Sequence, residues 1–143
     1  MTIYFAASIA GGRHYLETYR KIVDHLQQAG HTIPTVHIVH PQVLEVEKGL
    51  TPEQIYTRDV EWIEGSDCMI AEVSNPSLGV GYEIGYALNL DMPVLCLYHK
   101  DVFLSRMILG NTAPGLTVRS YESDEEWQAI VEEFLHGIRQ SEH

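Results

Sequence analysis

Apolar and polar residues follow two different patterns along the chain. Short apolar runs, typical of buried strands, are separated by longer stretches in which apolar residues recur every three or four positions, the spacing of amphipathic helices. Strands are expected over residues 2–8, 35–41, 67–74, 93–99 and 116–121. Helices are expected over residues 14–30, 51–66, 79–92, 105–111 and 124–140. Because strands and helices alternate, the sequence predicts an α/β protein.

Two of the expected helices carry start signals. Thr51 stands before Pro52 and is followed by Gln54, the spacing of a capping box with proline in the first turn. Ser123 and Glu126 have the same capping-box spacing before the last helix.

The alternation favours one topology. We expect a single doubly wound domain, Rossmann-like or flavodoxin-like, over residues 1–143. Its parallel sheet should hold about five strands, with helices on both faces. Ligands of such folds bind at the carboxyl ends of the strands, so functional residues should lie at that edge.

The charge balance limits the possible partners. With 9 basic and 20 acidic residues the formal net charge is −11, whereas surfaces that bind nucleic acids are basic. We therefore expect no polymeric nucleic acid as a partner. A small anionic ligand remains compatible with the composition, because a few backbone N–H groups and one arginine can form a local anion site.

The start of the chain and its cysteines indicate a compartment. No basic segment precedes the first apolar run, which is too short for a signal peptide or a membrane span. Cys68 and Cys96 lie in apolar runs and should be plain buried thiols. A cytoplasmic protein without a membrane partner is expected.

The sequence points to no cofactor and no metal. Gly79, Gly81 and Gly85 do not fit the dinucleotide-binding spacing. His37 and His40 should point to opposite faces of an expected strand, and no cysteine or carboxylate completes a metal site with them. What remains at the start of the 79–92 helix is free backbone N–H groups beside small hydroxyls, which suits one phosphate group.

Glu83 raises the question of what a carboxylate does in this helix. An acidic residue early in a helix can simply complement the helix dipole. However, the helix is apolar nearly all round and is expected to be buried, and a buried carboxylate must be paired or have a raised pKa. The requirement that a buried carboxylate be paired or have a raised pKa favours a functional site.

Asp59 is a second carboxylate on an apolar stripe. It shares its face of the helix with Ile55 and Ile63, which should turn toward the sheet. An ion pair with Arg58 or Arg13 would explain the position of Asp59 on this stripe without any catalytic role. Two carboxylates that both reach the strand ends suggest paired acid and nucleophile chemistry of the kind used on glycosidic bonds.

Four segments resemble a known family: YFAASIAGGR, RDVEW, AEVSNPSLGVGYEIG and LSRMILG. In this order they are similar to the 2'-deoxynucleoside 5'-monophosphate N-glycosidases (Rcl-type hydrolases), relatives of the nucleoside 2-deoxyribosyltransferases. The resemblance implies that Glu83 is the nucleophile, that Asp59 is the acid that assists departure of the base, and that Tyr4 lines the sugar and holds the nucleophile.

The resemblance also implies a phosphate site and a homodimer. Ser8, Ser77 and Gly79 match groups that bind the 5'-phosphate, and Ser105 matches a serine that the other subunit lends to it. Ile9, Gly11 and Arg13 are assigned to the same phosphate-binding group. Mammalian members have arginine where this chain has Ala10, and we expect the long guanidinium of Arg13 to take its place.

Three functions are compatible with these residues. The first is a metal-free hydrolase of (2'-deoxy)nucleoside 5'-monophosphates that releases the free base and (2-deoxy)ribose 5-phosphate. The second is a nucleoside 2-deoxyribosyltransferase, which would share Glu83 but should prefer a substrate without the phosphate. The third is a nucleotide-binding module without turnover. The choice of base depends on loops such as 44–50, whose conformation the pattern does not predict.

Overall fold

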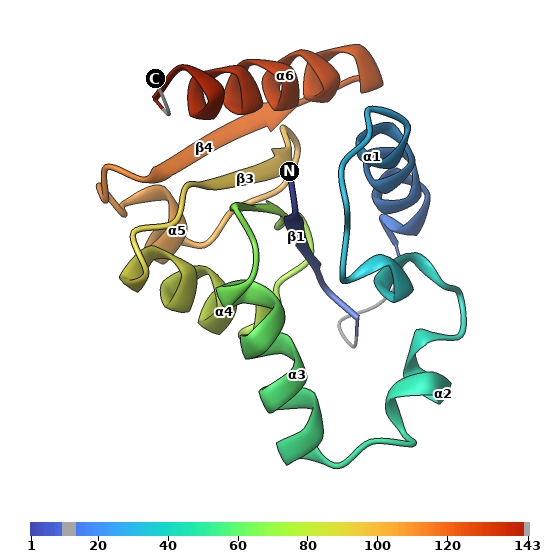
Figure 1. Ribbon diagram of the computed structural model, residues 1–143. Helices are drawn as coiled ribbons and strands as arrows, with labels where there is room; N and C mark the ends of the chain where they lie inside the picture. Colours follow the sequence, from blue (N-terminus) through green and yellow to red (C-terminus); the bar gives the residue numbers. More distant parts are fainter. Residues whose placement is uncertain (10–13, 142–143) are drawn as a thin grey trace.

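A parallel β-sheet forms the centre of the computed structural model, which describes residues 1–9 and 14–141 (Figure 1). Within this part of the chain the sheet has four strands: β1 (Ile3–Ala7), β2 (Cys68–Glu72), β3 (Val94–His99) and β4 (Leu116–Tyr121). They lie in the order β1-β2-β3-β4, and each neighbouring pair is parallel.

Helices cover both faces of the sheet, as Figure 1 shows. On one face α1 (Leu16–Gln28) and α6 (Asp124–Ser141) pack around the fully buried Trp127 and Tyr19. On the other face α3 (Pro52–Glu64) and α4 (Leu78–Asn89) pack through Ile63 and Ile84. Because both faces are covered, β1 and β2 are buried along their whole length. The predicted doubly wound α/β fold is confirmed.

Three short helices complete the described elements: η1 (Val36–Val39), α2 (Val43–Glu47) and α5 (Arg106–Leu109). No helix in the described ranges is both long and apolar enough to span a membrane. Cys68 and Cys96 are free, buried thiols, as expected, and burial raises the pKa of each to about 12.

The strand predicted over residues 35–41 is wrong, because this segment forms the 3-10 helix η1. Pro34 has no N–H to give to a ladder. The hydroxyl of Thr35 takes the place of the backbone: it accepts from the Phe5 N–H (3.1 Å) and donates to the Phe5 carbonyl (2.7 Å). A side chain thus occupies the hydrogen-bonding positions on β1 that a fifth strand would have used.

The contacts on the two sides of β1 show where the chain changes direction across the sheet. On one side β1 pairs with β2, and on the other the Ile3 N–H donates to the Thr32 carbonyl at 2.9 Å. After β1 the chain covers one face with α1, and it returns to β2 through α3 on the opposite face. The carboxyl ends of β1 and β2 are therefore a switch point, where open α/β sheets bind ligands.

The helix containing Glu83 was expected to be buried because it is apolar nearly all round, and this expectation is wrong for its outer side. Val80, Ile84 and Ala87 of α4 are buried against the sheet, but Tyr82 is 56% exposed and Leu78 is 97% exposed. A sheet can cover only one side of a helix, so the outer side of α4 forms part of the surface of the single chain.

Both expected capping boxes can be checked against the structure. Thr51 accepts from the Gln54 N–H (3.1 Å), and the Gln54 side chain accepts from the Thr51 N–H (2.9 Å), so this box is complete. Ser123 accepts from the Glu126 N–H (3.2 Å), whereas the Glu126 side chain accepts from the N–H of Glu122, one residue earlier than in a standard box.

Replacing Thr51 with alanine should lower the free energy of unfolding by about 1 kcal/mol, because the Gln54 N–H loses its acceptor. Thr57→Ala, at an exposed position in the middle of the same helix, is the matched control. It should be neutral or slightly stabilising, since alanine is the better helix former. Denaturant unfolding of both variants measures the difference, and equal losses would contradict the capping role.

Candidate active site

A cavity of about 390 Å³ opens between α3 and α4. Ile55, Val60 and Ile63 give it an apolar wall, and the carboxyl groups of Asp59 and Glu83 face into it. The two carboxylates that the sequence singled out are therefore brought together in one small, mostly apolar space.

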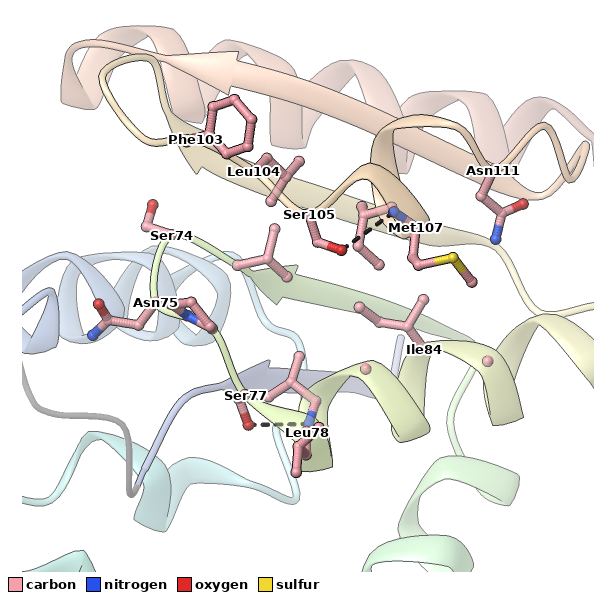
Figure 2. Close-up of a pocket in the computed structure, with 16 residues that line it drawn as sticks. Ser74, Asn75, Ser77, Leu78, Ile84, Phe103, Leu104, Ser105, Met107 and Asn111 are labelled. Atoms are coloured by element: carbon pink, nitrogen blue, oxygen red, sulfur yellow. Dashed lines mark hydrogen bonds between the residues drawn. The ribbon is translucent and has the colours of Figure 1, made fainter.

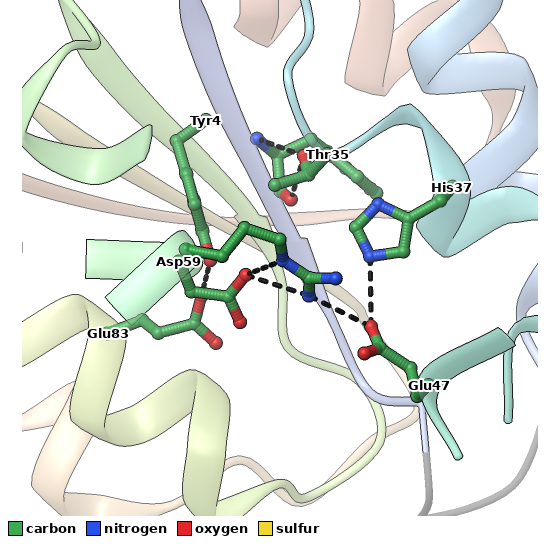
Figure 3. Close-up of polar contacts among 8 residues, drawn as sticks. Tyr4, Thr35, His37, Glu47, Asp59 and Glu83 are labelled. Carbon is green, nitrogen blue, oxygen red and sulfur yellow. Dashed lines mark hydrogen bonds and ion pairs between the residues drawn. The ribbon is translucent and has the colours of Figure 1, made fainter. Parts of the chain in front are cut away.

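Tyr4 holds Glu83 through a hydrogen bond. Tyr4 lies on β1 and is only 1% exposed, and its hydroxyl donates a hydrogen bond to Oε2 of Glu83 (Figure 3). Glu83 is the sixth residue of α4, beyond the first turn. Since the helix-dipole effect falls off within that turn, the dipole does not explain this carboxylate.

The surroundings of Glu83 favour its protonated form. Burial raises the pKa of Glu83 to about 7, and the nearby charge of Asp59 adds to the increase. The hydrogen bond from Tyr4 and the charge of Arg58 act in the opposite direction but do not cancel the effect of burial. In turn, burial and the charge of Glu83 raise the pKa of the Tyr4 hydroxyl, which stays protonated as a donor.

Asp59 combines an ion pair with a raised pKa. Nε and Nη2 of Arg58 both lie 2.9 Å from its Oδ1, so the predicted structural pairing is present. Burial nevertheless raises the pKa of Asp59, against the lowering effect of Arg58 and with a further increase from Glu47. Burial thus raises the pKa of both carboxyls, and the charge of Asp59 adds to the increase at Glu83.

Sequence reasoning missed the rest of this polar network. Oε1 of Glu47 on α2 accepts from Nη2 of Arg58 (3.0 Å) and lies 3.0 Å from Nε2 of His37 on η1 (Figure 3). The Arg58 guanidinium also stacks over the Trp62 ring, 4.8 Å from its centroid. No local pattern could have revealed Glu47, since it meets its partners through the folding of three separate elements.

A second feature that the sequence did not reveal fixes the turn into α4. Glu72 at the end of β2 is fully buried and accepts from the Ser74 N–H (2.7 Å), the Ser74 hydroxyl (2.8 Å) and the Tyr121 hydroxyl (2.5 Å). The Ser74 hydroxyl accepts in turn from the His99 N–H (2.9 Å). The only feature of the sequence that could have revealed the role of Glu72 is that it is a single acidic residue at the end of an apolar run.

Two of the predicted phosphate-site serines line a separate groove of about 650 Å³ (Figure 2). Ser77 is the N-cap of α4, and its hydroxyl accepts from the Val80 N–H (3.2 Å). Ser105 is the N-cap of α5, where its hydroxyl accepts from the Met107 N–H (3.2 Å). The groove and the carboxylate cavity are lined by different sides of α4.

The remaining predicted residues fall at the end of β1 and in the first turn of α4. Ser8 is buried directly after β1, with the half-buried Ile9 next to it. Gly79 lines the carboxylate cavity, where an added Cβ would lie 3.9 Å from the Ser77 hydroxyl and meet nothing nearer. Gly11 and Arg13, like Ala10, lie outside the described residues. Among the described residues, no group of three or more histidine, cysteine, aspartate or glutamate side chains is placed to hold a metal ion.

Comparison with known proteins gives a consistent set of relatives. Residues 3–114 match the family described as nucleoside 2-deoxyribosyltransferase. A Methanosarcina mazei protein, provisionally named 2'-deoxynucleoside 5'-phosphate N-hydrolase 1, is 44% identical over 96% of this chain and 85% of its own length. The 5-hydroxymethyl-dUMP N-hydrolase of Esox lucius is 40% identical over 96% of this chain and 98% of its own length.

Solved structures share the fold at lower identity. A CMP N-glycosidase from Clostridium botulinum is 18% identical, with a TM-score of 0.64 over 92% of this chain and 99% of that chain. A 2-deoxyribosyltransferase from Bacillus psychrosaccharolyticus is 23% identical, with a TM-score of 0.65 over 91% of this chain and 90% of that chain.

Glu83→Gln should raise the free energy of unfolding near pH 8 by an amount on the order of 2 kcal/mol. The pKa of Glu83 is raised from 4.5 to about 7 in the folded protein. As the pH rises through this window the unfolded chain loses its proton first, so stability falls, and glutamine avoids that loss. Below about pH 4 both side chains are neutral and the difference should vanish. Urea unfolding at both pH values tests this, with the exposed Glu61→Gln as control; a benefit independent of pH would contradict it.

Proposed function

The chain belongs to the nucleoside 2-deoxyribosyltransferase family, as its motifs predicted, and from this we propose that it hydrolyses the N-glycosidic bond of 2'-deoxynucleoside 5'-monophosphates. The products are the free base and 2-deoxyribose 5-phosphate. The observation that carries the proposal is the pair of carboxyls, Glu83 and Asp59, that face one apolar cavity from two helices. The names of relatives 40% and more identical over nearly the whole chain support hydrolysis of deoxynucleotides.

In the first step an ionised Glu83 oxygen attacks the anomeric carbon of the sugar. A bond forms between that oxygen and the carbon, the bond to the base breaks, and the bonding electrons leave with the base. Asp59 gives its proton to the departing base, an assistance typically worth ~10²–10⁴-fold in rate. Positive charge develops on the sugar beside Glu83 and favours the ionised form of that carboxyl.

In the second step water opens the glycosyl-enzyme. Asp59, now ionised, takes a proton from the water, whose oxygen bonds to the anomeric carbon while Glu83 departs as a carboxylate. The starting protonation state is thereby restored. Tyr4 keeps its hydrogen bond to Glu83 throughout, which holds the nucleophile in one orientation. Both steps require one proton on the two carboxyls, and burial raises the pKa of each group, which favours keeping a proton there.

The 5'-phosphate binds at the beginning of α4. Ser77 caps this helix, and the N-terminus of a helix attracts anions through its free N–H groups and its dipole. Gly79 leaves the approach from this end to the carboxylate cavity open. Ser8, Ile9, Gly11 and Arg13, from the loop after β1, complete the phosphate-binding group in this proposal.

A second copy of the chain covers the outer side of α4. The groove beside this helix is lined by the apolar and largely exposed Leu78, Phe103 and Met107, which are 97%, 83% and 83% exposed. Contiguous apolar surface of this kind is typical of protein interfaces. In the homodimer Ser105 of each copy contributes to the phosphate site of the other.

We propose that the protein acts in the cytoplasm and that its substrate is a small nucleotide. The proposed mechanism needs no cofactor and no metal, since two carboxyls and water supply every atom that moves. The net charge of −11 disfavours polymeric nucleic acid as a partner.

The proposed activity is tested by measuring free-base release from 2'-deoxy- and ribonucleoside 5'-monophosphates and from the corresponding nucleosides, with and without an acceptor base. Wild-type protein should release base from the deoxynucleotides, and Glu83→Ala should lose at least about a thousandfold in kcat, because it removes the nucleophile. Glu61→Ala, at an exposed position on α3, should keep full activity. Base exchange that requires an acceptor would make the protein a transferase, and binding without any release would make it a nucleotide-binding module.

Met107→Glu should convert a dimer into monomers, because it places a charge on the exposed apolar face. It should also raise the KM for the monophosphate, since Ser105 of the second copy is lost. Leu44→Glu, on the half-exposed side of α2, introduces the same charge elsewhere and should leave the dimer intact. Sedimentation measures the mass, and a wild-type protein that stays monomeric at high concentration would contradict the dimer.

A further inference from the structure

Arg58 creates a problem for the proposed proton donor. Two of its nitrogens lie 2.9 Å from Oδ1 of Asp59. A cation at this distance stabilises an ionised carboxylate, whereas a general acid must hold a proton at the pH at which it works. Taken alone, Arg58 would keep Asp59 in the wrong state.

Glu47 resolves this conflict by sharing the guanidinium. Nη2 of Arg58 donates to Oε1 of Glu47 at 3.0 Å, and the Arg58, Glu47 and Asp59 side chains are 22%, 13% and 25% exposed. Oε2 of Glu47 is buried, with no hydrogen-bond partner among the described residues. A buried carboxylate with so little solvation depends on a neighbouring cation. Arg58 is thus shared between Glu47 and Asp59.

The charges of these three groups decide which state of Asp59 is favoured. With Asp59 protonated, Arg58 and Glu47 form a neutral pair; with Asp59 ionised, the group carries a net negative charge in a partly buried place. Without the Glu47 charge the order reverses, because Arg58 and an ionised Asp59 would then form the neutral pair. Low-polarity surroundings favour the neutral arrangement in both cases.

We propose that Glu47 is a positioning residue for the proposed hydrolysis: by holding the Arg58 guanidinium, it lets Asp59 keep the proton that the leaving base receives. This inference rests on the proposed function, since it assigns Asp59 the role of acid. Glu47 itself touches no reacting atom and acts only through Arg58.

The geometry also selects the oxygen that carries the proton. Both contacts from Arg58 go to Oδ1 of Asp59, and Figure 3 shows the second oxygen of Asp59 on the side of Glu83. The guanidinium plane is fixed by the Trp62 ring, which lies 4.8 Å from its central carbon. Arg58 therefore occupies one oxygen and leaves the other, which faces the nucleophile, to hold the proton.

The groups around Asp59 come from five elements. Arg58 is its neighbour on α3, Glu47 lies on α2 and His37 on η1, while Glu83 and Tyr4 close the site from α4 and β1. After burial, Arg58 lowers the pKa of Asp59, Glu47 raises it, and His37, 3.0 Å from Glu47, lowers it. Glu47 is thus the acidic group whose removal shifts the balance toward ionised Asp59.

The test begins with a direct titration. Carboxyl ¹³C resonances of Asp59 and Glu83 are followed against pH in the wild-type protein, in Glu47→Gln and in Glu45→Gln. In Glu47→Gln the pair should lose its last proton about one pH unit lower than in the wild type. Glu45 lies on the same helix but is 71% exposed and pairs with Lys48 at 2.9 Å, so Glu45→Gln should titrate like the wild type.

The second measurement is the pH dependence of kcat/KM with a 2'-deoxynucleoside 5'-monophosphate. The alkaline limb reports loss of the essential proton, so Glu47→Gln should move this limb down by the same amount as the titration. Above the new limb the rate should fall by about tenfold relative to wild type. In an Arg58→Gln background the change at Glu47 should move the limb by less than half as much, because there is no guanidinium to share.

The outcomes separate the inference from the function on which it rests. Base release with identical titrations and identical alkaline limbs in wild type and Glu47→Gln would overturn the role of Glu47. An undiminished shift in the Arg58→Gln background would overturn action through Arg58. A titration shift in a protein that releases no base would support the charge coupling and overturn the hydrolase.

Discussion

The partial removal of two carboxyls from water is the constraint on which the site depends. Glu83 and Asp59 sit on α4 and α3, which pack on the same face of the sheet and leave an apolar cavity between them. Burial raises the pKa of both groups. In water two such carboxyls would both be ionised at neutral pH, and neither could donate a proton. The raised pKa of each carboxyl is therefore a product of the packing of the two helices.

The fold supports these costly groups from outside the cavity. Tyr4 reaches Glu83 from β1, and Arg58 supplies the one positive charge described beside the pair. Tyr4 and Arg58 stabilise the ionised forms without cancelling the effect of burial. The result is a balance in which one proton can move between substrate and protein. A larger stabilisation would fix both charges, and a smaller one would leave both groups protonated.

Local patterns predicted local structure, and long-range contacts set the limits of the prediction. The capping box at Thr51 and the period of α3 were readable, because each depends on residues within a few positions. The segment at Thr35 had the composition of a strand, but a hydroxyl contact with Phe5, thirty positions away, decided its structure. The role of Glu47 could not be predicted for the same reason, since its partner Arg58 comes from another element. Glu83 was found because a charge in an apolar helix is conspicuous in any single sequence.

The helix that carries Glu83 shows why apolar composition alone does not predict which sides of a helix are buried. Val80 and Ile84 are apolar because the sheet covers them, and Glu83 is acidic because it faces the cavity. Leu78 is apolar for neither reason, since it is almost fully exposed in the single chain. Three sides of one helix thus meet three different environments. Glu83 is half-buried, and the helix is buried only on the side that the sheet covers, because the sequence does not show which element covers each side. An apolar side that the chain itself leaves uncovered is the feature that a second copy would explain.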